Sequence, residues 1–166
     1  ALQELAVAHL VGVASGALSA SEQAAGEAAI IGAFRSSLAD TALDDAMRGE
    51  LMMLPSETYL FEAMASGGRL ADPGAIHTVR EGLKAAIGKA LAEELQALHA
   101  RASAIALDDP AGRGARKVKT QALVFLAAAD PARAAALAAQ QYDAADNMTD
   151  RQGALMVLCS LAGPER

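Results

Sequence analysis

The chain has 166 residues, of which 53% are hydrophobic and 20% charged, and its formal net charge is −6 at pH 7. This length is sufficient for one domain with a buried core, and the hydrophobic content excludes an intrinsically disordered protein. Because nucleic acids and anionic membrane lipids repel a negatively charged surface, we expect neither nucleic acid nor a membrane as a partner. Aromatic residues make up 3% of the chain and alanine, the strongest helix former, is its commonest residue, so the composition predicts an all-α protein.

The first two helices are predicted from the spacing of apolar residues. Leu2, Leu5 and Leu10 follow helical spacing with no N-cap residue before them, which predicts a helix over residues 1 to about 20. A second helix is predicted over residues 22 to 38. Because the pattern is already present at the first residues, we interpret the chain as a fragment that begins inside a helix.

Capping residues and prolines mark the next three helices. Thr41 is the predicted N-cap of one helix, and Ser56, which follows Pro55, is the predicted N-cap of the next. Asp72 then precedes Pro73, a pair typical of an N-cap and a first helical residue, where the missing amide hydrogen costs nothing. Apolar residues keep helical spacing from there to about residue 102, which predicts one long amphipathic helix.

The same signature returns at Asp130 and Pro131, so a helix is predicted to begin there, after another helix that starts near residue 115. Eight helices joined by short loops indicate a bundle or a solenoid. Since no repeat of fixed period is present, we expect an irregular α-superhelix. This is a solenoid of antiparallel helix pairs of the HEAT or ARM kind, and residues 1–166 form a single domain.

A short polar segment, residues 146–150, joins the last two helices. Thr149 and Gln152 fit a capping box, in which the Thr149 hydroxyl accepts from the amide of Gln152 and the Gln152 side chain bonds back to Thr149. Asn147 and Asp150 are expected to fasten the same corner through hydrogen bonds to backbone groups. We therefore assign a structural role to this corner.

Few residues point to catalysis or to a cofactor. None of the three histidines, His9, His77 and His99, stands in an H-E-x-x-H pattern, and a catalytic zinc ion needs three protein ligands. We expect no catalytic residue, no metal site and no cofactor in this chain. His77 and Glu81 share one helical face and could form half of a metal site, although a partly exposed histidine near a helix start is the plainer interpretation.

Two further features have an ordinary structural interpretation. Cys159 lies in an apolar segment and is predicted to be a buried, reduced thiol. Arg113, Arg116, Lys117 and Lys119 lie close together near a helix start, where they could hold a carboxylate or a phosphate. The net negative charge of the chain favours a solvated helix entrance instead.

Several short motifs in register indicate a family. In chain order they are Leu54-Pro55-Ser56, Asp72-Pro73, Val79-Arg80-Glu81, Phe125-Leu126 and Asn147-Met148-Thr149-Asp150. In order and spacing they resemble the C-terminal helical domain of bacterial aminopeptidase N, a family of zinc-dependent alanyl aminopeptidases of the thermolysin-like clan. The resemblance covers roughly residues 34–161.

The resemblance implies a part of an enzyme that is not itself catalytic. In that family the zinc ligands and the catalytic glutamate belong to an earlier domain, and the helical domain packs on that catalytic domain and shapes the cavity through which peptides enter. We therefore expect the catalytic domain of the same polypeptide and peptides as partners, truncation at both ends of the helical domain, zinc only in the parent enzyme, and a cytoplasmic location.

Two alternatives remain open. The chain could be an independent α-solenoid scaffold that binds a partner protein in a groove, or a small helical enzyme that uses His77 and Glu81. If a solenoid is cut between helix pairs, the uncovered face exposes apolar side chains. We expect such exposure near the end of the chain, and self-association through it, at Leu155, Val157, Leu158 and Leu161.

Overall fold

The computed structural model describes residues 2–106 and 108–162, which contain nine helices and no strand. The helices are α1 (Leu2–Ala14), α2 (Ala20–Ala39), α3 (Asp45–Leu51), α4 (Glu57–Ser66), α5 (Pro73–Ala90), α6 (Ala92–Ser103), α7 (Gly112–Ala129), α8 (Pro131–Ala144) and α9 (Met148–Ser160). The all-α fold predicted from composition is confirmed. None of the described helices combines the length and the apolar composition that crossing a membrane requires.

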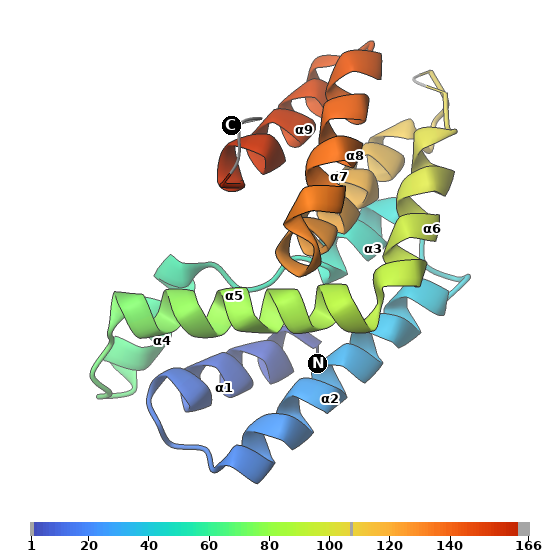
Figure 1. The fold of residues 1–166 in the computed structure, drawn as a ribbon. Coiled ribbons are helices and arrows are strands. Elements are labelled where there is room, and N and C mark those ends of the chain that lie inside the picture. The colour runs from blue at the N-terminus through green and yellow to red at the C-terminus, as the bar shows by residue number, and fades with distance from the viewer. Residues whose placement is uncertain (1, 107, 163–166) are drawn as a thin grey trace.

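Two central helices, α5 and α7, contact each other and divide the remaining helices between them (Figure 1). Helix α5 packs against α1, α2 and α4, while α7 packs against α3, α8 and α9, and both contact α6. Figure 1 shows α5 running across the molecule between the α1–α2 pair and the group formed by α7, α8 and α9. Several pairs of helices that follow each other in sequence pack together, such as α1 with α2 and α8 with α9. The predicted irregular solenoid of helix pairs is confirmed, since the chain matches a family model described as ARM repeats.

The two central helices approach each other closely at Gly88. A Cβ atom at this position would lie 2.2 Å from the carbonyl oxygen of Phe125 and 2.9 Å from the Cβ of Ala129. Only a residue without a side chain fits such a contact between backbones. The ring of Phe125 also meets the ring of Phe34 from α2 edge-on, with 5.4 Å between centroids, so this crossing lies within the core.

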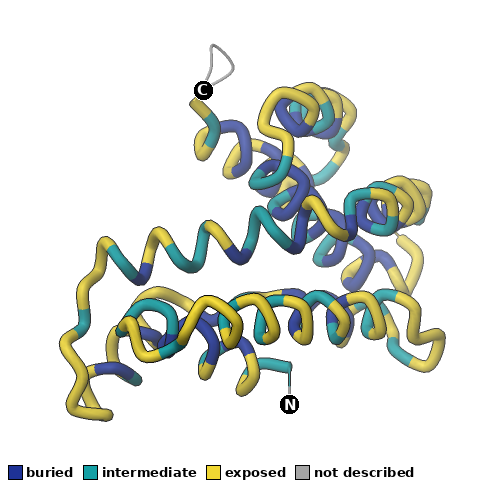
Figure 2. Tube along the Cα trace, turned by 60° about the horizontal axis from the view of Figure 1, so that its bottom comes forward, coloured by how far each residue is buried: buried dark blue, intermediate teal, exposed yellow. Residues whose placement is uncertain are grey.

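The core is one continuous cluster of buried apolar side chains that extends over all the helices except α3 and the N-terminal part of α2. Its fully buried members on α5, α6 and α7 include Ile87, Leu95, Val118 and Leu123. The chain is mostly exposed or half-buried along α2, whose buried residues are Ile30 and Phe34 (Figure 2). Of the described helices, α7 has the most buried residues and α2 is buried only around Ile30 and Phe34.

Side-chain caps fix where several helices begin. Ser56 accepts from the amide of Tyr59 at 3.2 Å at the start of α4. Asp72 accepts from the amide of Gly74 at 2.8 Å at the start of α5, whose first residue is Pro73. The predicted N-caps Ser56 and Asp72 are therefore confirmed.

The second Asp-Pro pair also caps a helix, although its aspartate accepts from the amide three residues on rather than two. Asp130 accepts from the amide of Arg133 at 3.1 Å, and Pro131 is the first residue of α8. Because one residue separates α7 from α8, Asp130 both ends one helix and caps the next.

The first two helices differ from their predicted ends. Helix α1 stops at Ala14 because the chain turns at Gly16, whose φ is 68°, a conformation that favours glycine. Helix α2 begins at Ala20, and Ser19 and Glu22 form its capping box. The first helix is therefore shorter than predicted, and the second begins two residues before its predicted start.

The predicted N-cap at Thr41 is wrong. Helix α3 begins at Asp45, and Asp44 caps it by accepting from the amide of Met47 at 2.7 Å. Thr41 lies in the turn before it. Three polar residues precede this helix, and sequence alone does not show which of them stands directly before the first helical residue.

The single long helix predicted from residue 73 to 102 is also wrong, since Leu91 separates α5 from α6. Its φ of −121° and ψ of 25° leave the helical range. The side chain of Arg35 donates to the carbonyl of Ala90 at 3.0 Å and to Glu94 at 3.1 Å, across the break. Apolar spacing continues through it, because Leu91 and Leu95 are both fully buried, so periodicity gave no sign of it.

The corner before α9 is capped by a different residue from the one predicted. Helix α9 begins at Met148, so Asn147 is its N-cap and accepts from the amide of Asp150 at 2.9 Å. The Thr149–Gln152 capping box is therefore wrong, since both residues lie within the helix and are exposed. The helix starts earlier because Asp150, placed in its first turn, is buried against α7.

Of the four apolar residues predicted to be exposed near the end of the chain, only Leu155 is exposed. Leu155 is 46% exposed, as expected, but Val157 and Leu158 are buried against the core, so the prediction for them is wrong. Leu161 is half-buried and packs on the core. Self-association through the exposed side chains stays a prediction.

The predicted burial of Cys159 is wrong as well, because its thiol is exposed. On α9 the residues that meet the core are Ala154, Val157 and Leu158, whereas Leu155, Met156 and Cys159 lie on the other side. This apolar segment therefore forms a helix with one buried side and one exposed side.

Substitution of Gly88 tests the crossing directly. We expect Gly88→Ala to destabilise the chain by about 1–3 kcal/mol, because the methyl group would overlap the Phe125 carbonyl. Gly82→Ala is the matched control in the same helix, since a Cβ there meets nothing within 4 Å. It should stabilise the chain by up to about 1 kcal/mol through helix propensity. The free energy of unfolding is measured by urea denaturation. Equal changes for the two variants would contradict the close approach of α5 and α7 at Gly88.

Substitution of the corner residues tests which of them is the cap. Asn147→Ala should lower the free energy of unfolding by about 1 kcal/mol or more, because it removes the acceptor for the Asp150 amide. Thr149→Ala, at an exposed position, should change it by less than about 0.5 kcal/mol. Thermal unfolding of both variants distinguishes the two caps. A larger loss of stability for Thr149→Ala than for Asn147→Ala would support the Thr149–Gln152 capping box.

Candidate functional site

A buried ion pair lies beneath the corner between α8 and α9. Lys119 of α7 donates to Asp150 in the first turn of α9, and both side chains are 9% exposed. The Nδ2 of Asn147 donates to the same carboxylate at 3.0 Å. Loss of one charge would leave the other buried and unpaired, at a cost of about 3–5 kcal/mol. The pair therefore ties the start of α9 to α7.

Gln141 and His99 extend this ion pair into a buried network. Gln141 of α8 donates from Nε2 to the backbone oxygen of Asp150 at 2.9 Å, so its Oε1 accepts from Nε2 of His99, also at 2.9 Å. Burial lowers the pKa of the His99 imidazole, against the opposing effect of the hydrogen bond with Gln141. Burial therefore favours the neutral imidazole, whose Nε2 is held as a hydrogen-bond donor to Gln141.

A cavity of about 550 Å³ lies beside the network, which supplies His99, Lys119, Gln141 and Asp150 to its lining. Ser103 also lines it, but its hydroxyl donates to the backbone carbonyl of His99 at 2.8 Å. A serine nucleophile needs a base that accepts from its hydroxyl. The lining thus offers charge and hydrogen bonds but no activated nucleophile.

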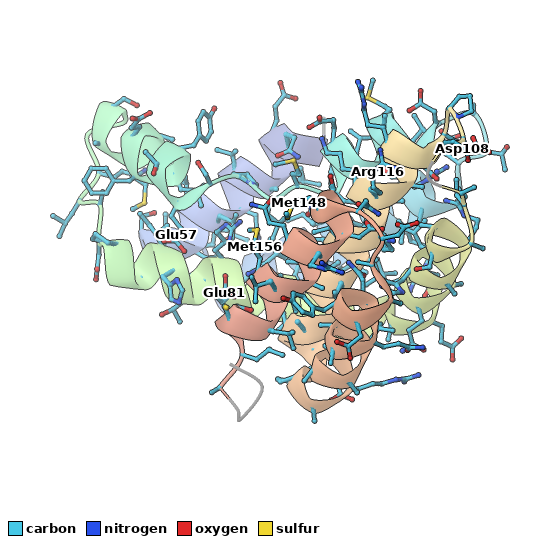
Figure 3. All side chains as sticks on the ribbon, turned by 90° about the horizontal axis from the view of Figure 1, so that it is seen from above. Glu57, Glu81, Asp108, Arg116, Met148 and Met156 are labelled. Atoms are coloured by element: carbon cyan, nitrogen blue, oxygen red, sulfur yellow. The ribbon has the colours of Figure 1, made fainter. Side chains whose placement is uncertain are left out.

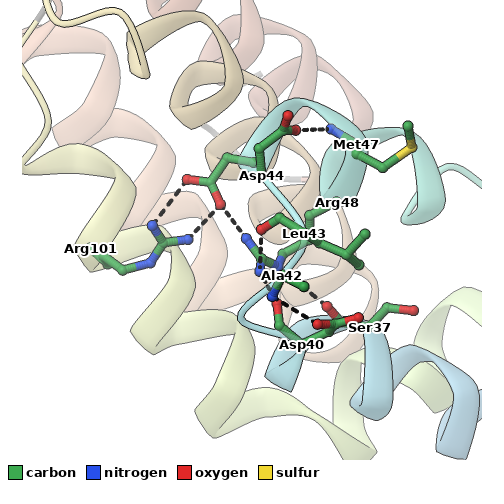
Figure 4. Close-up of polar contacts among 9 residues, drawn as sticks. Ser37, Asp40, Ala42, Leu43, Asp44, Met47, Arg48 and Arg101 are labelled. Carbon is green, nitrogen blue, oxygen red and sulfur yellow. Dashed lines mark hydrogen bonds and ion pairs between the residues drawn. The ribbon is translucent and has the colours of Figure 1, made fainter.

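A second polar cluster joins α3 to α6 (Figure 4). Asp45 accepts from the two terminal nitrogens of Arg101 at 3.0 and 2.7 Å, and also pairs with Arg48. Arg101 holds the pKa of the Asp45 carboxyl below its usual value, although burial acts in the opposite direction. Arg48, which is 7% exposed, donates to three backbone carbonyls within residues 37–43. The cluster fastens the loop before α3.

The four basic residues near the start of α7 do not converge on one ligand. Lys117 pairs with Glu50 and Lys119 with Asp150, on different sides of the helix. Arg113 and Arg116 line a groove of about 1200 Å³ beside the Asp45 cluster. The anion site considered from the sequence is therefore not formed by these four side chains together.

The three histidines are also separated, on α1, α5 and α6. Among the described residues, His77 is the one histidine in a group of three possible metal ligands. Its Nδ1 lies 2.8 Å from Oε1 of Glu57, and Glu81 lies one turn further along α5. One ligand atom from each of these three residues lies within 4.8 Å of the others, and residues 2–106 and 108–162 contain no other such group. In Figure 3 Glu57 and Glu81 lie in the left half of the view, whereas Arg116 lies in the right half.

Sequence reasoning identified half of this cluster and missed the other half. The spacing of His77 and Glu81 is visible as an i,i+4 pair, whereas Glu57 is the first residue of α4 and precedes His77 by 20 positions. No sequence signal marked the pairing of Lys119 with Asp150 across 31 positions.

The match to a known family extends over the whole chain. Residues 1–166 match the model of a family described as a domain of unknown function, DUF3458_C, with ARM repeats.

Two curated relatives have the same name. The chain is 31% identical over 146 residues to aminopeptidase N of Caulobacter vibrioides, a match that covers 85% of this chain and 16% of the relative. It is 33% identical over 124 residues to aminopeptidase N of Escherichia coli, covering 74% of this chain and 14% of the relative. The matches thus span about one sixth and one seventh of the length of these two relatives.

The fold is also present in a solved structure. The crystal structure of Legionella pneumophila aminopeptidase A in complex with aspartic acid superposes with a TM-score of 0.75 and 23% identity, covering 95% of this chain and 19% of that one. The chain belongs to the DUF3458_C family of ARM-repeat domains, and it is similar to the C-terminal helical domain of aminopeptidase N, as its sequence motifs indicate.

Proposed function

We propose that this chain is a non-catalytic segment of the C-terminal helical domain of a zinc aminopeptidase. The parent enzyme removes N-terminal residues from peptides, and its zinc belongs to a separate catalytic domain. The observation that carries the proposal is the identity of 31–33% to two enzymes named aminopeptidase N, over 74–85% of this chain.

The chain's own residues do not fit the zinc site of that family. A zinc peptidase of the thermolysin-like kind places two histidines and a glutamate in an H-E-x-x-H motif, and the sequence contains no such motif. The group around His77 offers one histidine and two carboxylates from two helices, which is a different arrangement. The proposal therefore assigns no catalytic step to this chain.

The role we propose is to pack on the catalytic domain and to shape the cavity through which peptides enter. Large apolar side chains exposed on one helix, α9, support a further contact surface, since monomeric proteins seldom leave such groups together in water. On α9 these are Met148 and Met156, which are 75% and 64% exposed (Figure 3). We further propose that the segment is one part of a longer helical domain and that the parent enzyme is cytoplasmic.

The reading frame that encodes this chain provides the first test. An H-E-x-x-H motif upstream in the same frame is expected. A frame that ends near these 166 residues would favour an independent solenoid scaffold and overturn the proposal.

The full-length enzyme provides the functional test. Removal of this segment should change selectivity, so that the ratio of kcat/KM for a long peptide to that for a small alanyl reporter shifts, because the access cavity is altered. Metal analysis must find the catalytic zinc retained, which shows that the catalytic domain survives. Unchanged turnover of both substrates would contradict the proposed role.

A further inference from the structure

We propose that Glu57, His77 and Glu81 form a binding site for a divalent transition-metal ion, and that Zn²⁺ is the ion it binds. This inference does not rest on the proposed peptidase function, and it revises the expectation that the chain holds no metal.

The backbone brings the three ligands together without strain. Glu57 is the first residue of α4, and the turn that follows α4 returns the chain so that α5 packs against it. His77 and Glu81 stand one helical turn apart on α5, so both side chains lie on the face that meets Glu57. The site is therefore built from two helices that already pack together.

The distances suit a metal ion of zinc's size. Ligand atoms at about 2.0–2.2 Å from a tetrahedral zinc ion lie about 3.4 Å from each other. The 2.8 Å between His77 and Glu57 and the 4.8 Å limit for the whole group bracket that value. The side chains of Glu57 and His77 are 47% and 64% exposed, so small rotations can bring them to the ion, and water can complete its coordination.

The donor set decides which ions are favoured. An imidazole nitrogen with two carboxylates suits zinc and its transition-metal neighbours, whereas Mg²⁺ and Ca²⁺ take oxygen ligands. Two negative carboxylates beside one neutral imidazole also compensate the charge of a divalent cation. We therefore expect Zn²⁺ and Co²⁺ to bind and Mg²⁺ not to compete at equal concentration.

Without metal, Glu81 is occupied by a cation of the protein. The Nζ of Lys84 lies 2.5 and 2.7 Å from the two oxygens of Glu81, and Arg80 lies 3.3 Å from one of them. Arg80 is anchored separately, because its Nε donates to the carbonyl of Pro55 at 2.8 Å. Lys84 is therefore the group that a metal ion displaces.

Titration of the 166-residue chain with Zn²⁺ by calorimetry is the test. It should be made with Cys159→Ser in every variant, because that thiol is exposed and could hold zinc by itself. One Zn²⁺ per chain is expected, and His77→Ala and Glu57→Gln should each weaken binding at least roughly tenfold. Glu62→Gln, another exposed carboxylate on α4, is the matched control and should leave the affinity unchanged.

Lys84→Met gives the sharpest result. It keeps the half-buried stem but removes the competing charge, so Zn²⁺ should bind several-fold more tightly. Zn²⁺ should also raise the melting temperature of the parent chain but not that of His77→Ala, since an ion that binds only the folded state stabilises it. No stoichiometric binding up to millimolar Zn²⁺, or an affinity unaffected by both His77→Ala and Lys84→Met, would overturn the proposal.

Discussion

The contact between α5 and α7 is the constraint on which the rest of this fold depends. At Gly88 the two backbones are so close that a Cβ atom would lie 2.2 Å from the Phe125 carbonyl. Helices α1, α2 and α4 pack on one partner of this crossing and α3, α8 and α9 on the other, with α6 against both. A change in the α5–α7 distance therefore acts on both groups of helices, because interiors are closely packed and yield little.

Away from this crossing, polar side chains hold neighbouring helices together. The Lys119–Asp150 pair with Gln141 and His99 holds α9 to α6, α7 and α8, and the Asp45 cluster with Arg48 and Arg101 holds α3 to α6. The charges of both clusters are used in ion pairs and hydrogen bonds between helices. The group around His77 differs from these clusters. His77 and Glu57 are exposed, and Glu81 is paired with Lys84, whose side chain is flexible.

Features coded by neighbouring residues could be predicted from the sequence, and features that depend on distant contacts could not. The Asp72-Pro73 and Asp130-Pro131 starts were found because cap and proline act within one turn. The break at Leu91 was missed because its apolar spacing continues and its supporting residue, Arg35, is 55 positions from the carbonyl it bonds. Asn147 was missed as the cap because several neighbouring residues can cap a helix, with differences of about 1 kcal/mol, and the burial of Asp150 against Lys119 decides between them. For the same reason the sequence indicates only two ligands of the candidate metal site, His77 and Glu81, because Glu57 lies 20 positions before His77.

Native-state hydrogen exchange over a range of denaturant concentrations tests most directly whether the α5–α7 crossing holds the two groups of helices together. The account predicts that amides near the crossing, such as those of Ile87 and Phe125, exchange only through global unfolding, at the highest free energy of opening in the chain. Helices α1, α2, α8 and α9 should open at or below that free energy. If the α8–α9 pair or the α1–α2 pair kept its protection after α5 and α7 had opened, the two groups would be stable without the crossing, and the account would be contradicted.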